Sequence, residues 1–141
     1  MKKILYPTDG SDNANKALEY VKDFAKKFEA KVIVLINYEI PNYYGRYDAM
    51  QVFNDLDSQL RRNCTEIAEK KVAELAEEGI DAVHIVTTGD AGDRVVQEAE
   101  RHNVDFIVMG CRGLGGIKSF LLGSVSNYVL HHTNIPTLII K

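Results

Sequence analysis

The sequence predicts an α/β fold: an open, five-stranded parallel sheet with helices on both faces. Short apolar runs rich in β-branched residues recur along the chain, and amphipathic helical patterns separate them. The runs are nearly continuous rather than alternating, which is typical of strands buried on both faces. Strands that alternate with helices imply right-handed crossovers and hence a parallel sheet.

The strands are expected where the apolar runs occur. Runs this short favour strands, because helices usually need ten or more residues. The five predicted strands are Lys3 to Tyr6, Lys31 to Asn37, Ala82 to Thr87, Asp105 to Met109 and Thr137 to Ile140.

Four helices are predicted from apolar residues at helical spacing. Ser11 or Asp12 fits an N-cap of the first helix, and the second stops at Gly79. The fourth ends before Ile135-Pro136, because the residue before a proline disfavours helix. The apolar positions are Ala14, Ala17, Leu18, Val21, Phe24 and Phe28; Leu56, Leu60, Cys64, Ile67, Ala68, Leu75 and Ala76; Val95, Val96 and Ala99; and Val125, Tyr128 and Val129.

Length and composition limit the class of protein. The chain has 141 residues, 45% hydrophobic and 26% charged, which predicts one folded domain over residues 1–141. A net charge of −3 provides no basic field, so nucleic acid is not an expected partner. The apolar runs are too short to cross a bilayer and no signal sequence develops, so we expect a cytoplasmic protein without membrane contact.

Several conspicuous residues have plain structural interpretations. Cys64 fits the apolar stripe of its helix, whereas Cys111 lies in a glycine-rich loop where exposure is possible. His131 and His132 fall near the end of the last helix, where a cation suits the helix dipole. The segment Tyr38 to Asp48 contains four tyrosines and is either a surface loop or a flap over a ligand.

The end of the first strand carries a carboxylate and two hydroxyls, in Pro7-Thr8-Asp9-Gly10-Ser11. Ligands of open parallel sheets bind beyond the carboxyl ends of the strands, where the strand order reverses. Asp9 therefore has two interpretations. It forms a turn into the next helix, or it binds a ribose hydroxyl or a metal ion.

The fourth strand leads into a glycine-rich segment, 110–116, and Gly123-Ser124 then opens a helix. Glycines let backbone N–H groups approach phosphate oxygens, and a helix N-terminus favours an anion. Ser126 adds a hydroxyl, while Arg112 and Lys118 add positive charge. The segment predicts phosphate binding, although it matches neither the Walker loop nor the GxGxxG dinucleotide fingerprint.

Three motifs in this order resemble the universal stress protein family. Gly110-x2-Gly113-x9-Gly123-Ser124 is similar to that family's ATP-binding motif, and segments 3–11 and 134–140 are similar to its start and end. The resemblance covers the whole chain. It implies the adenine nucleotide α-hydrolase-like strand order 3-2-1-4-5, with an ATP cleft between strands one and four. The two unusual strand ends indicate the same location.

The resemblance also implies roles for individual positions. Asp9 would bond the ribose, the backbone of Thr8 and of Ile36 or Asn37 would meet the adenine, and the glycines would wrap the phosphates. ATP, or AMP or ADP, would bind with Mg²⁺ or Mn²⁺, and Thr137 to Lys141 would pair in a homodimer. The implied binding residues are Pro7, Thr8, Asp9, Ile36, Asn37, Met109, Gly110, Arg112, Gly113, Gly123, Ser124, Val125 and Ser126.

Two residues depart from the family pattern. Cys111 stands where a small hydroxyl residue is usual, and Asn37 puts an amide where a member may carry an apolar residue. Both positions are expected to act through their backbone, so neither departure argues against nucleotide binding.

Three functions remain open. The first is an ATP-binding regulatory or stress-response protein with at most slow hydrolysis, since no positioned base or arginine finger is apparent. The second is a phosphoryl- or nucleotidyl-transferring enzyme that uses Asp9, although Asp12 is the only acid close to it in sequence. The third is a dimeric interaction module without a ligand, against which the intact glycine pattern argues.

Overall fold

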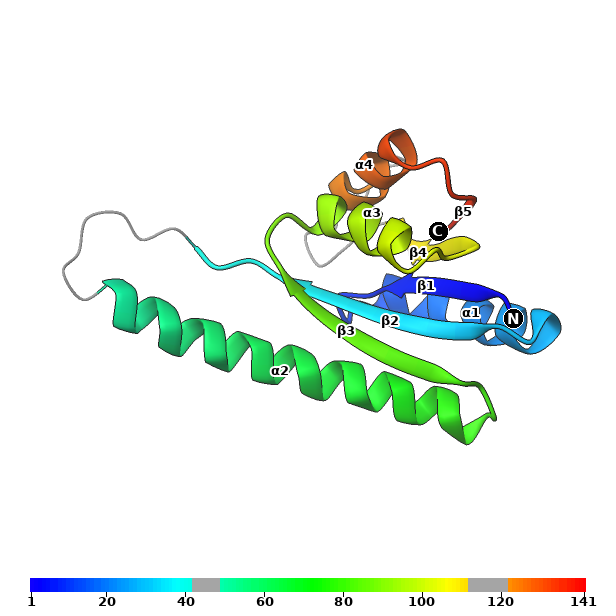
Figure 1. Ribbon diagram of the computed structural model, residues 1–141, viewed down its shortest axis with the longest axis horizontal. Helices are drawn as coiled ribbons and strands as arrows, with labels where there is room; N and C mark the ends of the chain where they lie inside the picture. The colour runs from blue at the N-terminus through cyan, green and yellow to red at the C-terminus, as the bar shows by residue number, and fades with distance from the viewer. Residues whose placement is uncertain (42–48, 112–121) are drawn as a thin grey trace.

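The computed structural model describes residues 1–41, 49–111 and 122–141. Strands and helices alternate along these ranges, as the sequence predicts (Figure 1). The elements are β1 (Lys3–Pro7), α1 (Asp12–Phe28), β2 (Lys31–Tyr38), α2 (Ala49–Glu77), β3 (Ala82–Thr88), α3 (Ala91–Arg101), β4 (Phe106–Gly110), α4 (Ser124–His132) and β5 (Thr137–Ile140).

The five strands form one parallel sheet in the order β3-β2-β1-β4-β5, which confirms the predicted fold class. From β1 the chain moves outward through β2 to β3. It then returns to the other side of β1 with β4 and β5. The order therefore reverses between β1 and β4, and their carboxyl ends form the switch point of the sheet.

Successive strand residues contribute to two separate cores. Ile4 and Tyr6 pack with α1 and α2 on one face, whereas Leu5 packs with α3 and α4 on the other (Figure 1). This alternation is the period of two expected of a strand, and because both faces are covered the strands are apolar throughout.

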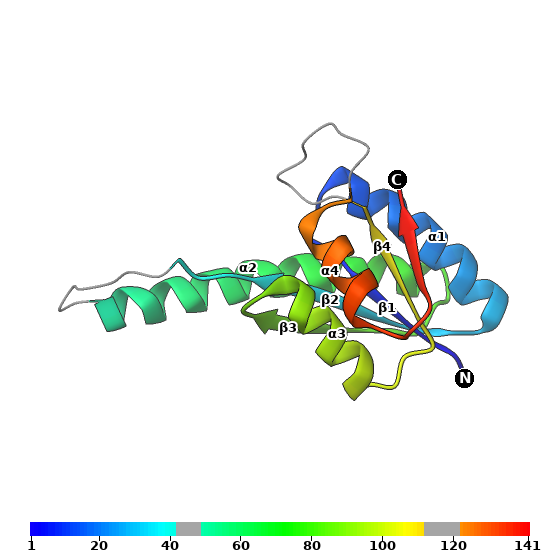
Figure 2. The same ribbon diagram turned by 90° about the horizontal axis from the view of Figure 1, so that it is seen from above.

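Helix α2 differs from its prediction at its start. It begins at Ala49, before the first predicted apolar position at Leu56, and its first half runs past the end of the sheet (Figure 2). Leu56 and Leu60 are therefore only half-buried. At 29 residues α2 is the longest helix in the described ranges, yet no helix there has the apolar length to span a bilayer.

Three residues have surroundings that differ from the sequence interpretation. Tyr38 is not part of a loop: it ends β2, is buried, and donates its hydroxyl to Asp57 on α2 at 2.6 Å. Cys64 is half-buried, and burial raises the pKa of its thiol. Cys111 is 3% exposed rather than accessible, because it directly continues β4.

A buried lysine joins α1 to α2. Lys22 is 7% exposed, donates to Glu19 at 2.9 Å and to Glu74 at 2.7 Å, and lies 3.0 Å from Glu78. Burial alone would lower the pKa of Lys22, but the hydrogen bonds to these carboxylates outweigh it and raise the pKa above its ordinary value.

Replacing Lys22→Met should destabilise the fold, because Glu19, Glu74 and Glu78 would lose the buried cation that they share, although Lys26 still pairs with Glu78 and Lys71 with Glu74. We expect the free energy of unfolding to fall by roughly 1–3 kcal/mol near neutral pH. Hydrogen bonds with Lys26 and Lys22 lower the pKa of Glu78, so its contribution is present above the ordinary glutamate pKa and is lost as pH falls through the lowered folded value.

Urea denaturation of both proteins near neutral pH and below about pH 4 measures this effect. The difference between the native chain and Lys22→Met should shrink in acid. The matched control is Lys27→Met, which changes an exposed lysine of the same helix. A destabilisation of equal size at both pH values would contradict the ionic origin.

Candidate functional site

The switch point brings together residues from the ends of β1 and β4. Ile4 lies beside Phe106 and Leu5 beside Ile107, and continuing this register brings Pro7 level with Met109 and Thr8 level with Gly110. These four predicted site residues are buried, and the N–H of Thr8 donates to the carbonyl of Leu35 at 2.9 Å. They form the floor of the carboxyl edge between the two strands.

Asp9 forms a turn that leads into α1. One carboxylate oxygen, Oδ1, accepts the N–H of Ser11 at 2.9 Å, and the hydroxyl of Thr8 accepts the N–H of Gly10 at 3.2 Å. Ser11 is the N-cap of α1 and accepts the N–H of Ala14 at 3.2 Å. The turn interpretation of Asp9 is therefore confirmed, and the turn holds the carboxylate on the exposed side of the switch point.

At Gly110 the end of β4 lies very close to the start of α1. A Cβ atom there would lie 2.3 Å from Oδ1 of Asn13 and 3.1 Å from its backbone carbonyl carbon. Real Cβ atoms do not approach that closely, so the Asn13 side chain would have to shift and the start of α1 would have to give slightly. Gly110 therefore has a packing role that the sequence did not reveal.

The backbone of Cys111 holds α4 against the end of β4. Its carbonyl oxygen accepts the N–H of Gly123 at 2.6 Å and the hydroxyl of Ser126 at 2.7 Å. Its N–H donates to the carbonyl of Ile140 in β5 at 2.9 Å. These bonds hold the first turn of α4 beside the switch point. They also engage the Ser126 hydroxyl, which we had expected to be a ligand donor.

The N-terminus of α4 has no side chain capping it. Gly123 is the N-cap, with φ −62° and ψ 162°, and makes no side-chain cap hydrogen bond. The first N–H to bond back within the helix is that of Asn127, which donates to the carbonyl of Gly123 at 2.9 Å. The N–H groups of Ser124, Val125 and Ser126 have no acceptor within the helix, which is the arrangement that binds anions.

The end of β2 forms the other side of this edge. Ile36 is buried there, and the amide of the following residue, Asn37, is half-buried. Nδ2 of Asn37 donates to the carbonyl of Gly89 at 2.7 Å, and Oδ1 accepts the hydroxyl of Thr87 at 3.0 Å. The predicted base-binding position thus also makes contacts with the turn after β3.

Two groups of predicted residues lie outside the described ranges. Arg112, Gly113 and Lys118 belong to 112–121, and most of the tyrosine-rich segment belongs to 42–48. Their proposed contacts with phosphate, and the flap, remain predictions.

The turn from β3 into α3 is a feature that the sequence reasoning missed. Asp90 is the N-cap of α3 and accepts the N–H of Asp93 at 2.9 Å. Gly89-Asp90 between a strand pattern and a helix pattern is a recognisable turn and N-cap signal. His131 and His132 lie in the last turn of α4, as the sequence predicts, and their Nδ1 atoms donate to the carbonyls of Asn127 and Tyr128 at 2.7 and 2.8 Å.

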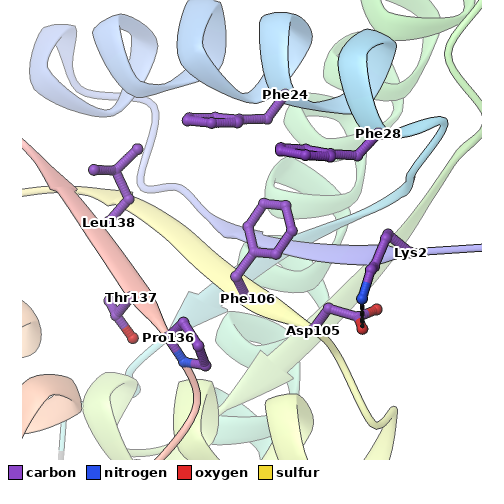
Figure 3. Close-up of a pocket in the computed structure, with 8 residues that line it drawn as sticks. All are labelled: Lys2, Phe24, Phe28, Asp105, Phe106, Pro136, Thr137 and Leu138. Atoms are coloured by element: carbon purple, nitrogen blue, oxygen red, sulfur yellow. Dashed lines mark hydrogen bonds and ion pairs between the residues drawn. The ribbon is translucent and has the colours of Figure 1, made fainter.

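A cavity of about 400 Å³ lies at the opposite, amino end of the sheet (Figure 3). The Phe106 ring points at the rings of Phe24 and Phe28, with centroids 6.0 Å away in both cases. The charged side chains at its rim, Lys2 and Asp105, pair with each other at 3.2 Å. No residue of the predicted nucleotide site lines this cavity.

Comparison with known proteins decides the family. The profile of the universal stress protein family matches residues 1–141. The chain belongs to the universal stress protein family. The universal stress protein MJ0577 of Methanocaldococcus jannaschii is 32% identical over 154 residues, covering 99% of this chain and 94% of the relative. A relative from Thermus aquaticus is 35% identical over 145 residues, covering 99% and 98%.

Solved structures of universal stress proteins share the fold. The MJ0577 structure has a TM-score of 0.89 and 34% identity, covering 99% of this chain and 95% of the other. A universal stress protein in complex with cAMP has a TM-score of 0.72 and 25% identity, covering 99% and 97%. The family assignment that the three motifs suggested is confirmed.

The packing role of Gly110 in this universal stress protein can be tested by Gly110→Ala. The new methyl group would overlap Asn13, so we expect the free energy of unfolding to fall by about 1–3 kcal/mol. The double variant Gly110→Ala/Asn13→Ala removes the Oδ1 contact but keeps the backbone contact at 3.1 Å, and should recover part of the loss. Urea denaturation measures both, and an unchanged stability of Gly110→Ala would contradict the close approach.

Proposed function

We propose that this chain is a cytoplasmic, single-domain regulatory protein of the stress response that binds ATP at the switch point between β1 and β4. The observation that carries the proposal is the uncapped N-terminus of α4, held against the end of β4 by the Cys111 carbonyl. An anion site beside the carboxylate of Asp9 gives one edge of the sheet groups for both phosphate and ribose.

Each part of the nucleotide has suitable partners. Asp9 bonds the ribose hydroxyls, and the backbone of Thr8 and of Ile36 or Asn37 contacts the adenine, with Pro7 and Met109 beneath. The phosphates bind to the backbone N–H groups of Ser124, Val125 and Ser126, close to the Gly123 backbone, together with Gly110, Arg112 and Gly113. AMP and ADP share the base and ribose contacts and bind at the same place.

The cAMP complex of a universal stress protein supports an adenine nucleotide as the ligand class, since that protein is 25% identical to this chain over 99% of its length. The same site and partners accommodate ATP, whose additional phosphates match the N-terminus of α4.

Mg²⁺ or Mn²⁺ accompanies the nucleotide and neutralises charge on its phosphates. The described residues contain no group of three or more His, Cys, Asp or Glu side chains that could hold a metal ion. Mg²⁺ keeps several waters and binds phosphate oxygens directly, so waters and the phosphates can supply its ligands while Asp9 bonds the ribose.

Regulation is favoured over phosphoryl transfer. Oδ1 of Asp9 already accepts the Ser11 N–H, which stabilises the carboxylate as part of a turn rather than as a nucleophile. A phosphoacceptor aspartate usually belongs to a group of carboxylates that binds its metal, and the described residues contain no metal-binding group of three or more His, Cys, Asp or Glu side chains. ATP hydrolysis is therefore at most slow.

The anion site is tested by two substitutions of Ser124. Proline is well tolerated at the first helical position, and the extended backbone of Gly123 suits a residue that precedes proline. Ser124→Pro thus removes one N–H without breaking α4, whereas Ser124→Ala removes only the hydroxyl. We expect Ser124→Pro to weaken ATP binding roughly tenfold and Ser124→Ala to have a much smaller effect.

Isothermal titration with ATP and Mg²⁺ measures both affinities, and circular dichroism checks the fold. Equal ATP affinity of Ser124→Pro and Ser124→Ala would contradict the role of the helix N-terminus. Nucleotide released from the freshly purified native chain, identified by mass, is the direct check on the ligand. Absence of any bound or titratable nucleotide would overturn the proposed function.

We also propose that β5 mediates a homodimer. β5 lies at the edge of the sheet, and Leu138 in it is 36% exposed. Open edges present unpaired backbone groups that readily pair with a second chain.

Leu138→Lys places a charge on this edge and should shift the protein to monomer in light scattering. The matched control is Val83→Lys on β3, the other edge strand, where Val83 is 39% exposed. A Leu138→Lys variant that remains a dimer, or a Val83→Lys variant that becomes a monomer, would contradict the assignment of β5 to the interface.

A further inference from the structure

The amide of Asn37 has a fixed orientation. A carbonyl oxygen can only accept, so the group facing the Gly89 carbonyl at 2.7 Å must be Nδ2. Oδ1 then faces the hydroxyl of Thr87 at 3.0 Å, which donates to it. Both ends of the side chain therefore bond to residues at the end of β3.

Asn37 stands where an apolar row on the α3 face of the sheet ends. Ile33 and Leu35 precede it at the strand period of two, and both belong to the core shared with α3 and α4. Asn37 lies directly beside Thr87 in the register of β2 and β3. The amide thus replaces a third apolar residue at the carboxyl edge, next to the predicted base site.

The turn that Asn37 contacts, Thr88 to Asp90, is held from two further directions. The N–H of Gly89 donates to the carbonyl of Tyr38 at 3.1 Å, and Nε of Arg94 donates to the carbonyl of Thr88 at 3.0 Å. Gly89 has φ +115°, a backbone conformation that other residues rarely adopt. A turn with this many bonds is fixed in place rather than free to adapt.

We propose that Asn37 is a positioning residue of the nucleotide site, which holds the turn 88–90 as a wall on the base side of the cleft. This rests on the proposed function. The base lies beyond the ends of β1 and β2, and the turn after β3 is the next element along the same edge. Asn37 acts through this turn, since its side-chain bonds go to Thr87 and Gly89 and not to the nucleotide.

A base-side wall has a distinctive binding signature. Adenosine, AMP and ATP share the base, so a displaced wall should weaken all three by the same factor. Loss of a phosphate contact weakens ATP but leaves adenosine unchanged. The pattern across the three ligands therefore separates a base-side effect from the phosphate-side effect of Ser124→Pro.

Two variants remove different hydrogen bonds between Asn37 and the end of β3. Asn37→Ala removes both bonds and should weaken adenosine, AMP and ATP by roughly tenfold each. Thr87→Val removes one bond, leaves the Gly89 bond in place, and should weaken them by a smaller factor. The matched control is Thr65→Val on α2, which removes a threonine hydroxyl that donates to the Arg61 carbonyl at 2.7 Å, away from the switch point and from β5. It should leave all three affinities unchanged.

The experiment combines titration of the full chain with amide hydrogen exchange by NMR. We expect the Gly89 N–H, which donates to Tyr38, to exchange faster in Asn37→Ala, while the core amides of β1 keep their protection. If Asn37→Ala does not fold, Thr87→Val tests the same pattern of affinities for adenosine, AMP and ATP, with a smaller expected loss.

Three outcomes would overturn the proposal. Native-like affinities in Asn37→Ala and Thr87→Val, with binding intact in the native chain, would remove Asn37 from the site but leave the proposed function standing. Weaker ATP binding with unchanged adenosine binding would move Asn37 to the phosphate side. A native chain that binds none of the three ligands would overturn the proposed function and this inference with it.

Discussion

The hydrogen bonds of the Cys111 backbone are the constraint on which the candidate site depends. Its carbonyl uses both acceptor positions, one for the Gly123 N–H and one for the Ser126 hydroxyl, and its N–H reaches Ile140. A buried carbonyl left without partners would cost about 1–3 kcal/mol, so these bonds strongly favour one placement of α4. The backbone of Cys111 therefore links β4, β5 and α4, and it brings a helix N-terminus to the edge where the strand order reverses.

The glycines of this region have different physical causes, although they read as one motif in the sequence. Gly110 is required because α1 crosses the end of β4 with Asn13 only 2.3 Å from where a Cβ would be. Gly123 leaves the first turn of α4 without a side-chain cap, so no serine, threonine or aspartate oxygen competes with an incoming anion. One glycine permits the packing that forms the edge, and the other keeps the edge open to a ligand.

The sequence was sufficient for features that depend on local pattern. The strands, the strand order through the family resemblance, and the Ser11 cap all rest on periodicity or on contacts over a few residues. It was insufficient for contacts between distant segments. The Cys111 backbone bonds Ile140 and Ser126, and the Asn37 amide bonds partners 50 and 52 residues further on. The first half of α2 also carries apolar residues. Only the structure shows that this half runs past the end of the sheet, which leaves Met50, Val52 and Phe53 exposed.

The two halves of the proposed cleft are carried by different elements, yet they are mechanically joined. The base side belongs to β2, β3 and the turn into α3, whereas the phosphate side belongs to β4, β5 and α4. Helices α3 and α4 pack together in one core. The Tyr128 hydroxyl of α4 lies 3.4 Å from Oδ1 of Asp93 on α3. The N–H of Asp93 in turn donates to Asp90, the N-cap of α3. The turn at Gly89 leads directly into α3, and α3 packs against α4. These contacts therefore join the base side and the phosphate side of the proposed cleft through one packed pair of helices.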